Sequence, residues 1–278
     1  MRDTVNPPIV EVDGGALKGR WVGEVAVFKG IPYAAPPVGG LRFAPPEPAP
    51  RLGDLRDATS YGPIAPQLPS RLNRIMGDFD LPQSEDCLTL NIWTPSAGGA
   101  PLPVLFWLHG GAYTSGAGSI GWYSGQAFAA SGRAVVVTVN YRLGPLGFLY
   151  LPGLSGGNLG LLDQIAALKW VKANIARFGG DPGAITVAGQ SAGARSAAHF
   201  MADPETASLF RRAILQSGPL GQAPAKPDQA ATVARDYLAL LEIAPGNEAE
   251  LRRLPAERLI RAAAELARRM KRFAEGRI

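Results

Sequence analysis

Short apolar runs, separated by longer segments of mixed character, dominate the middle of the chain. These runs are rich in β-branched residues and lack the alternation of a half-exposed strand, so they are typical of strands that are buried on both faces of a sheet. We predict central strands at residues 88–93, 104–108, 134–139, 184–188 and 213–215.

Helical patterns lie between the later strands. Residues 161–178 place Leu162, Ile165 and Leu168 on one face, and residues 192–201 are rich in alanine. Alternation of strands and helices implies right-handed crossovers and a parallel sheet. After Pro219 the pattern changes to helices only, at residues 228–241 and 255–273. We predict one α/β domain over residues 1–278, with a mostly parallel central sheet flanked by helices.

The N-terminal region has a different pattern. Residues 9–12 and 16–19 are strand-like pieces joined by turn residues at Asp13-Gly14-Gly15, which predicts a small antiparallel sheet. Residues 30–83 are rich in proline and glycine but carry buried-type aromatic residues, so we interpret them as an ordered covering loop without regular elements.

Composition narrows the class of protein. The chain has 278 residues, 46% of them hydrophobic, which is enough for a large core. No apolar run has the length of a membrane span, and the N-terminus lacks the hydrophobic stretch of a secretory signal, so we predict no membrane partner and a cytoplasmic location. The single cysteine, Cys87, is expected to be a buried thiol. We predict neither a metal nor a cofactor.

The net charge of +5 arises from one end of the chain. Residues 251–278 contain nine Lys or Arg and three Glu, which leaves 19 basic and 20 acidic residues elsewhere. The excess of positive charge therefore belongs to a single helix, and the sequence does not indicate a nucleic-acid partner. That helix carries apolar residues at helical spacing, which need a packing partner and leave homo-oligomerisation open: Leu259, Ala263, Leu266, Met270 and Phe273.

The strongest chemical signal is the pentapeptide from Gly189 to Gly193, which has the form G-x-S-x-G and lies between a predicted strand and a predicted helix. This is the context of a nucleophile elbow, in which Ser191 would attack a carbonyl and the N–H of Ala192 would bind the oxyanion. The loop that begins at His109 has the form H-G-G-x and follows the strand at 104–108, so Gly111 and Ala112 are the other predicted oxyanion donors.

A general base for this serine is not evident. The sequence contains two histidines, His109 and His199. His109 is expected to be a structural residue of the H-G-G-x loop. His199 follows Ser191 by eight positions on the same helix, about 12 Å along the axis and beyond hydrogen-bonding reach. The acid and the histidine of a catalytic triad are therefore not found in this chain.

Several separate motifs resemble those of the type-B carboxylesterases, the α/β-hydrolase family that includes para-nitrobenzyl esterases and cholinesterases. They occur in the family's order and cover essentially the whole chain: residues 30–33, 41–43, 85–92, 140–148, 163–164, 178–193 and 215–218.

The resemblance implies ion pairs between Arg42 and Glu85 and between Arg142 and Asp163, and it places Ser217 in a polar network near the acid. In this family the acid and the histidine follow the serine on later strands. The resemblance thus implies an N-terminal, nucleophile-bearing portion of the fold, with the C-terminal part missing.

The leading hypothesis is a carboxylic ester hydrolase that acts through an acyl-enzyme on small or aryl esters. Tyr113, Trp122 and Phe148 are the candidates for lining its substrate pocket. A complementing C-terminal half would then be a partner. The alternative is a truncated, non-catalytic binding or interaction module derived from the esterase fold.

Overall fold

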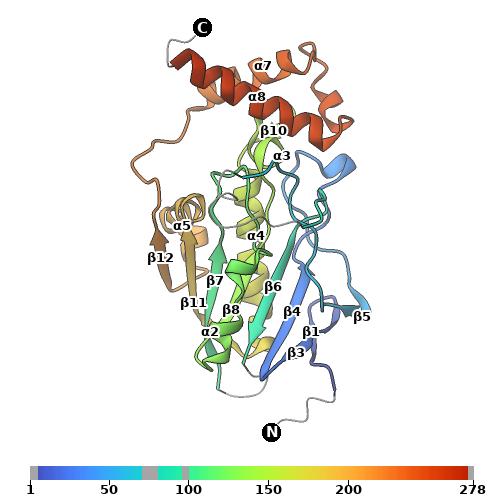
Figure 1. Ribbon diagram of the computed structural model, residues 1–278, viewed down its shortest axis with the longest axis vertical. Coiled ribbons are helices and arrows are strands. Elements are labelled where there is room, and N and C mark those ends of the chain that lie inside the picture. The colour runs from blue at the N-terminus through green and yellow to red at the C-terminus, as the bar shows by residue number, and fades with distance from the viewer. Residues whose placement is uncertain (1–5, 71–80, 96–99, 275–278) are drawn as a thin grey trace.

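The structure is a computed structural model that describes residues 6–70, 81–95 and 100–274, with the side chains of residues 272–274 left out. A seven-stranded sheet forms its centre (Figure 1). Its strands, in order across the sheet, are β12 (Arg212–Gln216), β11 (Gly180–Gln190), β7 (Leu102–Leu108), β8 (Val135–Val139), β6 (Thr89–Thr94), β4 (Val25–Pro32) and β3 (Arg20–Val22). All the predicted central strands are present close to their predicted bounds.

The sheet is mixed, which corrects the prediction of a mostly parallel one. Strands β12, β11, β7 and β8 run parallel to one another. β6 is antiparallel to β8 and to β4, and β3 is antiparallel to β4. Only residues 95–101 connect β6 to β7. That connection is too short for the crossover that a parallel arrangement needs, so the chain reverses direction there.

A smaller sheet covers one side of the molecule. β1 (Ile9–Val12) pairs antiparallel with β2 (Gly15–Lys18), as predicted. The third strand, β5 (Gly53–Asp57), pairs parallel with β2 and comes from the loop that was predicted to have no regular elements. All residues of β5 are exposed, so its sequence carries no apolar alternation to indicate a strand. Of that loop, residues 71–80 lie outside the described residues.

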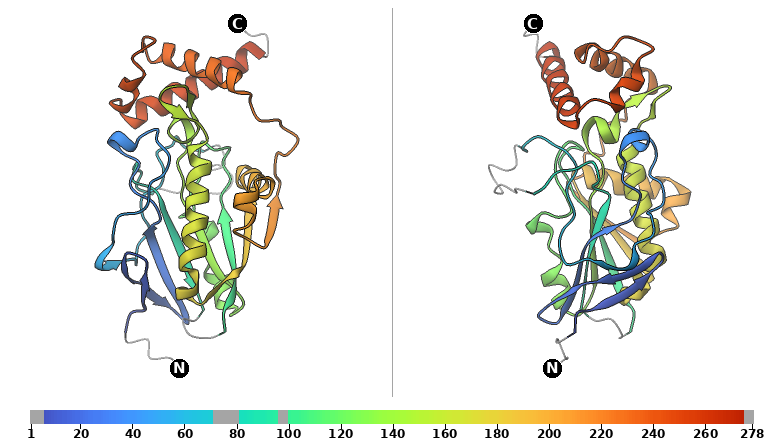
Figure 2. Two further views of the ribbon diagram at one scale, coloured as in Figure 1. Left: turned by 180° about the vertical axis from the view of Figure 1, so that it is seen from behind. Right: turned by 90° about the vertical axis from the view of Figure 1, so that its right-hand side faces the viewer.

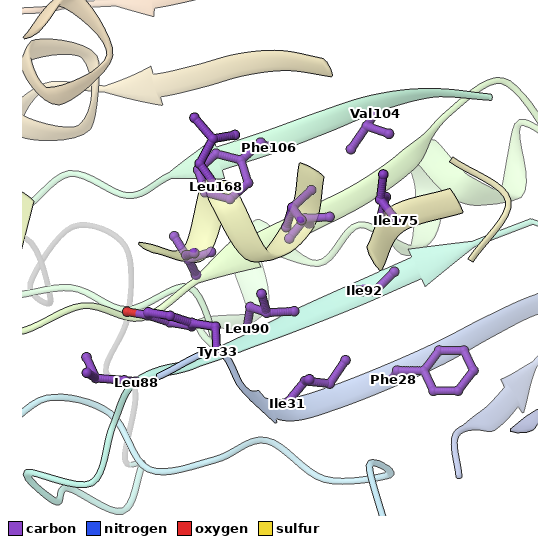
Figure 3. Packing of buried hydrophobic residues seen from close by; sticks show 14 of the residues in the cluster. Phe28, Ile31, Tyr33, Leu88, Leu90, Ile92, Val104, Phe106, Leu168 and Ile175 are labelled. Carbon is purple, nitrogen blue, oxygen red and sulfur yellow. The ribbon is translucent and has the colours of Figure 1, made fainter. Parts of the chain in front are cut away.

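Helices cover both faces of the central sheet. On one face, α4 (Leu159–Asn174), its 3₁₀ continuation η3 (Ile175–Phe178) and α5 (Ala192–Ala202) share the main hydrophobic core with the strands. Figure 3 shows Leu168 of α4 over strand residues such as Phe106. On the other face, α2 (Gln126–Ala130) packs against Trp93 and Val136 (Figure 2, right).

The buried face of α4 differs from the predicted one. Leu162 is 37% exposed, whereas Asp163 and Gln164 are fully buried beside Ala167 and Leu168. An apolar-periodicity argument places charged residues outside, but Asp163 is paired with Arg142 inside the protein. Because of this ion pair, the face of α4 that is buried includes Asp163 and is not the face that the spacing of apolar residues predicts.

Beyond the carboxyl ends of the parallel strands lies a helical layer of α7 (Pro227–Leu240) and α8 (Ala256–Ala274), visible at the top of Figure 1. Leu259 and Leu266 of α8 are buried in a second hydrophobic core with residues of α7 and α3 (Gly144–Phe148). The apolar stripe of α8 thus has a packing partner within this chain, although Met270 is 48% exposed. The side chain of Phe273 lies outside the described residues.

Arg42 joins the covering loop to this helical layer. Its Nη1 donates to the carbonyl oxygens of Leu251, Arg252 and Leu254, at 3.2, 3.0 and 2.6 Å. Its Nε donates to Glu85 Oε2 at 2.7 Å, which confirms the expected ion pair. One guanidinium therefore satisfies carbonyl groups at the end of η4 (Glu248–Arg252) and a carboxylate from the loop.

The edge strand β12 is the other correction. We expected it to be buried on both faces, but its residues alternate between exposed and half-buried, and Ile214 is 45% exposed. Within the described residues β12 pairs with β11 only, so it lies at the edge of the sheet. An edge strand is covered less completely than a central one.

The remaining elements are short. They are β9 (Tyr150–Leu151), β10 (Ser155–Gly156), α6 (Pro204–Ala207), η1 (Gly39–Leu41) and η2 (Gly121–Tyr123). No helix in the described part of the chain combines the length and the apolar character that crossing a bilayer requires.

Candidate active site

Ser191 occupies the sharp turn between β11 and α5. Its backbone angles are φ 53° and ψ −116°, a conformation that non-glycine residues rarely adopt and that costs roughly 1–3 kcal/mol. Its N–H donates to the carbonyl of Gln216 at 2.8 Å, which ties the turn to the end of β12. The residue is half-buried, so the turn presents the serine at the surface of the sheet's carboxyl end.

The glycines on either side of the turn are required by close backbone contacts. A Cβ at Gly189 would collide with the carbonyl group of Gly193. A Cβ at Gly193 would collide with the carbonyl oxygen of Leu108 and lie 2.8 Å from that of His109. The first turn of α5 therefore packs directly on the loop that follows β7, as the sequence pattern predicts.

This loop lies beside the serine. A Cβ at Gly110 would lie 3.2 Å from Ser191 Cβ. Gly111, Ala112 and Tyr113 all have positive φ, at 120°, 54° and 59°. Among the described residues, no acceptor is found for the N–H groups of Gly111 and Ala112, whereas the Gly111 carbonyl accepts from Thr114 and Ser115 at 3.0 Å. The loop therefore turns sharply and, as far as the described residues show, leaves the N–H groups of two successive residues without an acceptor.

The structure brings two of the three pocket candidates together. The rings of Tyr113 and Phe148 are 4.6 Å apart, between centroids. Trp122 packs edge-on against Tyr123 instead, with the centroids 6.2 Å apart, and is 39% exposed. Their role as a pocket lining stays a prediction.

Neither histidine is bonded to the serine. His109 is buried, its Nδ1 lies 2.8 Å from the Gly110 carbonyl oxygen, and its ring stacks on Tyr141 with the centroids 4.2 Å apart. Its Nε2 has no hydrogen-bond partner among the described residues. His199 is exposed on α5. Neither of the two histidine side chains is therefore a hydrogen-bonded base for Ser191 among the described residues.

Burial of His109 has a consequence for stability. Desolvation lowers its pKa to about 4, against an ordinary 6.5, although the Gly110 carbonyl opposes this shift. Between these values the unfolded chain binds a proton that the folded chain does not, so the free energy of unfolding falls as the pH falls. We expect a loss of about 2 kcal/mol between pH 7.5 and pH 5 from this residue.

Urea unfolding at the two pH values, with wild type and the His109→Phe variant, measures this contribution. The variant keeps an aromatic ring against Tyr141 and should lose about 2 kcal/mol less stability than wild type over the same interval. His199→Gln, on the exposed side of α5, is the control and should follow wild type. An equal pH dependence in wild type and His109→Phe would contradict the prediction.

The buried Arg142–Asp163 ion pair joins the segment that follows β8 to α4. Arg142 Nη2 and Nε donate to the two carboxylate oxygens of Asp163, at 2.7 and 2.8 Å, and the Arg142 backbone N–H donates at 3.1 Å. Burial raises the pKa of the Asp163 carboxyl, and the guanidinium opposes that rise. This pair, which the resemblance implied, is confirmed.

Sequence reasoning missed several polar contacts that hold the loop after β7. The Tyr141 hydroxyl donates to the His109 carbonyl oxygen at 2.7 Å. The side-chain amide of Gln67 donates to the Gly116 carbonyl and accepts from its N–H, at 3.0 and 2.7 Å. The Tyr113 hydroxyl donates to the Ala192 carbonyl at 2.8 Å. The partners are far apart in sequence, and no local pattern indicates them.

Three features define an α/β-hydrolase. They are a strained serine between a strand and a helix, a facing loop whose N–H groups have no acceptor in the described part of the chain, and helices on both faces of a mixed sheet. The chain belongs to the carboxylesterase family, whose family model matches residues 6–276.

Its curated relatives include proteins named as esterases and hydrolases. The chain is 46% identical over 262 residues to the para-nitrobenzyl esterase of Bacillus subtilis, an alignment that covers 93% of this chain and 53% of that protein. It is 43% identical over 258 residues to the phenmedipham hydrolase of Pseudarthrobacter oxydans, which covers 92% of this chain and 52% of that protein. The chain thus spans about half the length of these curated relatives.

Solved structures give the same picture. A thermophilic para-nitrobenzyl esterase superposes with a TM-score of 0.88 at 45% identity, over 98% of this chain and 55% of that one. A Geobacillus stearothermophilus carboxylesterase superposes with a TM-score of 0.85 at 47% identity, over 93% of this chain and 53% of that one. The described fold is therefore that of the para-nitrobenzyl esterases.

Proposed function

We propose that this protein is a carboxylic ester hydrolase that acts through Ser191. The hydroxyl of Ser191 would attack the ester carbonyl, and the N–H groups of Gly111, Ala112 and Ala192 would bind the oxyanion. The ester C–O bond would then break and release the alcohol, which takes up the proton lost by the serine. Water would finally hydrolyse the acyl-serine to the carboxylic acid and the free hydroxyl. The observation that carries this proposal is the contact of the strained serine turn with a loop whose two successive N–H groups have no acceptor among the described residues.

The proton of the serine hydroxyl needs an acceptor that the two histidines do not provide. Because the curated relatives are about twice as long as this chain, we propose that a complementing C-terminal segment supplies the histidine and the acid. In that arrangement the present chain contributes the nucleophile and the oxyanion donors. Each donor would stabilise the transition state by about 3 kcal/mol.

The proposed substrates are small or aryl carboxylic esters. The names of two relatives, a para-nitrobenzyl esterase and a phenmedipham hydrolase, support this class. The rings of Tyr113 and Phe148, next to the loop, would contact the acyl or aryl group, and Trp122 is the third candidate. The cytoplasmic location predicted from the sequence remains part of this proposal.

Labelling with a fluorophosphonate tests the nucleophile. We expect slow, stoichiometric modification at Ser191, identified by mass spectrometry of the labelled peptide, because the oxyanion donors still favour attack at this position. The Ser191→Ala variant should not be labelled. Ser131→Ala, which changes an exposed serine at the end of α2, is the matched control and should be labelled as wild type is.

Failure of this labelling would distinguish the two hypotheses. Absence of modification at Ser191, or modification that persists in Ser191→Ala, would contradict the nucleophile assignment. That result would favour the alternative of a non-catalytic binding or interaction module.

A further inference from the structure

The proposed oxyanion donors come from two segments that are far apart in the sequence. Gly111 and Ala112 lie in the loop after β7, and Ala192 lies at the start of α5. Donors of this kind must be held to within roughly 0.5 Å of the productive geometry to be effective. Some contact must therefore set the position of the loop relative to the helix.

Tyr113, the residue directly after the two loop donors, makes such a contact. Its hydroxyl donates to the carbonyl oxygen of Ala192 at 2.8 Å and lies 3.1 Å from Ser196 Oγ. Both partners belong to α5, and Ser196 is fully buried. Ala192 is at once the third proposed donor, through its N–H, and the acceptor of the Tyr113 hydroxyl, through its carbonyl.

The rest of Tyr113 is held as well. Its ring packs on Phe148 with the centroids 4.6 Å apart, and its carbonyl accepts from the Gly144 N–H at 2.7 Å. Both partners belong to α3. The residue thus connects the loop to two helices, with its hydroxyl on α5 and its ring and carbonyl on α3.

Backbone strain in the loop makes these contacts consequential. Ala112 and Tyr113 both carry a Cβ and have φ values of 54° and 59°. Such conformations are strained for residues that carry a Cβ, and they persist where surrounding contacts impose them. Without the hydroxyl contact to α5, the loop loses a restraint immediately next to its strained, donor-bearing residues.

The hydroxyl is suited to this role because it stays protonated. Burial raises the pKa of Tyr113, and the hydrogen bond with Ser196 opposes the rise. A neutral phenol donates one hydrogen bond and accepts another, which matches the Ala192 carbonyl as acceptor and the Ser196 hydroxyl as donor.

We propose that Tyr113 is a positioning residue that sets the Gly111 and Ala112 donors against the Ala192 donor through its hydrogen bond to the Ala192 carbonyl. This inference rests on the proposed function, because it assigns a role within the same oxyanion site. It differs from the predicted role of Tyr113 as a pocket wall, since it concerns the hydroxyl and not the face of the ring.

The Tyr113→Phe variant removes the hydroxyl and keeps the ring against Phe148. Two measurements on the 278-residue chain report on it. Hydrogen–deuterium exchange of peptides that cover residues 105–120 reports on how well the hydrogen bond from Tyr113 to Ala192 restrains the loop, and it needs no enzymatic activity. The concentration dependence of phosphonylation at Ser191 separates the maximal rate from the probe concentration at half saturation.

We expect faster exchange in the loop and a maximal phosphonylation rate about tenfold below wild type, with the half-saturating concentration within twofold, because a displaced donor weakens oxyanion binding more than probe binding. Ser196→Ala, which leaves the Ala192 carbonyl as a partner, should have a smaller effect. Tyr61→Phe is the matched control, since Tyr61 is a half-buried tyrosine whose ring lies under Lys29, and both measurements should follow wild type.

Each outcome has one meaning. Unchanged exchange in Tyr113→Phe overturns the inference whatever the labelling shows. Faster exchange with an unchanged phosphonylation rate also overturns it, because the hydrogen bond would then restrain the loop without affecting the oxyanion donors. Wild type that is never labelled at Ser191 overturns the proposed function first, and the positioning role with it.

Discussion

The 278-residue chain is expected to hydrolyse a short para-nitrophenyl ester about 10⁶-fold more slowly than a serine esterase with a complete triad. The physical reason is that a serine hydroxyl attacks rapidly only when a positioned base removes its proton. Neither histidine ring is hydrogen-bonded to Ser191, and desolvation lowers the pKa of His109 to about 4, so its ring accepts a proton weakly. Binding and oxyanion stabilisation are then what remains of catalysis.

Steady-state hydrolysis of para-nitrophenyl butyrate, followed at 400 nm, measures this rate against the uncatalysed background. Ser191→Ala should remove what activity there is. His109→Ala should change it little once the folded fraction is taken into account. Turnover comparable with that of a complete esterase, abolished by His109→Ala, would show that the structural role assigned to this loop is wrong.

Asp163→Ala is expected to reduce the free energy of unfolding by about 3–5 kcal/mol. Both partners of the ion pair are almost fully buried, with side-chain exposures of 4% for Arg142 and 0% for Asp163. Removing the carboxylate leaves the guanidinium without its charged partner in a place that water does not reach. Within the residues that the structure describes, the acceptor that remains for it is the Ala44 carbonyl oxygen, at 2.8 Å from Nη1.

Urea unfolding at pH 7.5 measures this loss. Glu257→Ala is the matched control, because it removes a carboxylate that pairs with Arg261 on the exposed face of α8 and should cost about 0.5 kcal/mol or less. The double variant Arg142→Met with Asp163→Leu should recover much of the lost stability, since no buried charge is left unpaired. A single variant as stable as wild type would mean that the pair does not support the fold.

Much of the fold was predictable because it depends on short segments. The runs at 104–108 and 184–188 are almost wholly apolar, which is typical of central strands, and their residues are buried or half-buried in β7 and β11. The pentapeptide around Ser191 carries its own geometry, since Gly189 and Gly193 remove the Cβ atoms that would collide in the turn. The position of the loop after β7 was predictable for a similar reason, as an H-G-G-x segment directly after a strand.

Other features were not predictable from local patterns. β5 is exposed along its whole length, so it lacks a burial signal and is recognised only by its pairing with β2. The burial of Asp163 on α4 depends on Arg142, which lies 21 positions away in the sequence. The nucleophile and donor assignments themselves stay predictions, which the labelling and hydrolysis experiments test.

The sequence by itself determined most of the central strands, the longer helices and the place where a serine is forced into a tight turn, because each of these follows from side chains within a few residues of one another. Only the tertiary structure decided that β6 pairs antiparallel with β8, that β12 lies at an exposed edge and that the Tyr113 hydroxyl donates to the Ala192 carbonyl. These features depend on contacts between residues far apart in the chain. Such contacts exist only when the whole fold is assembled, so a local pattern does not encode them.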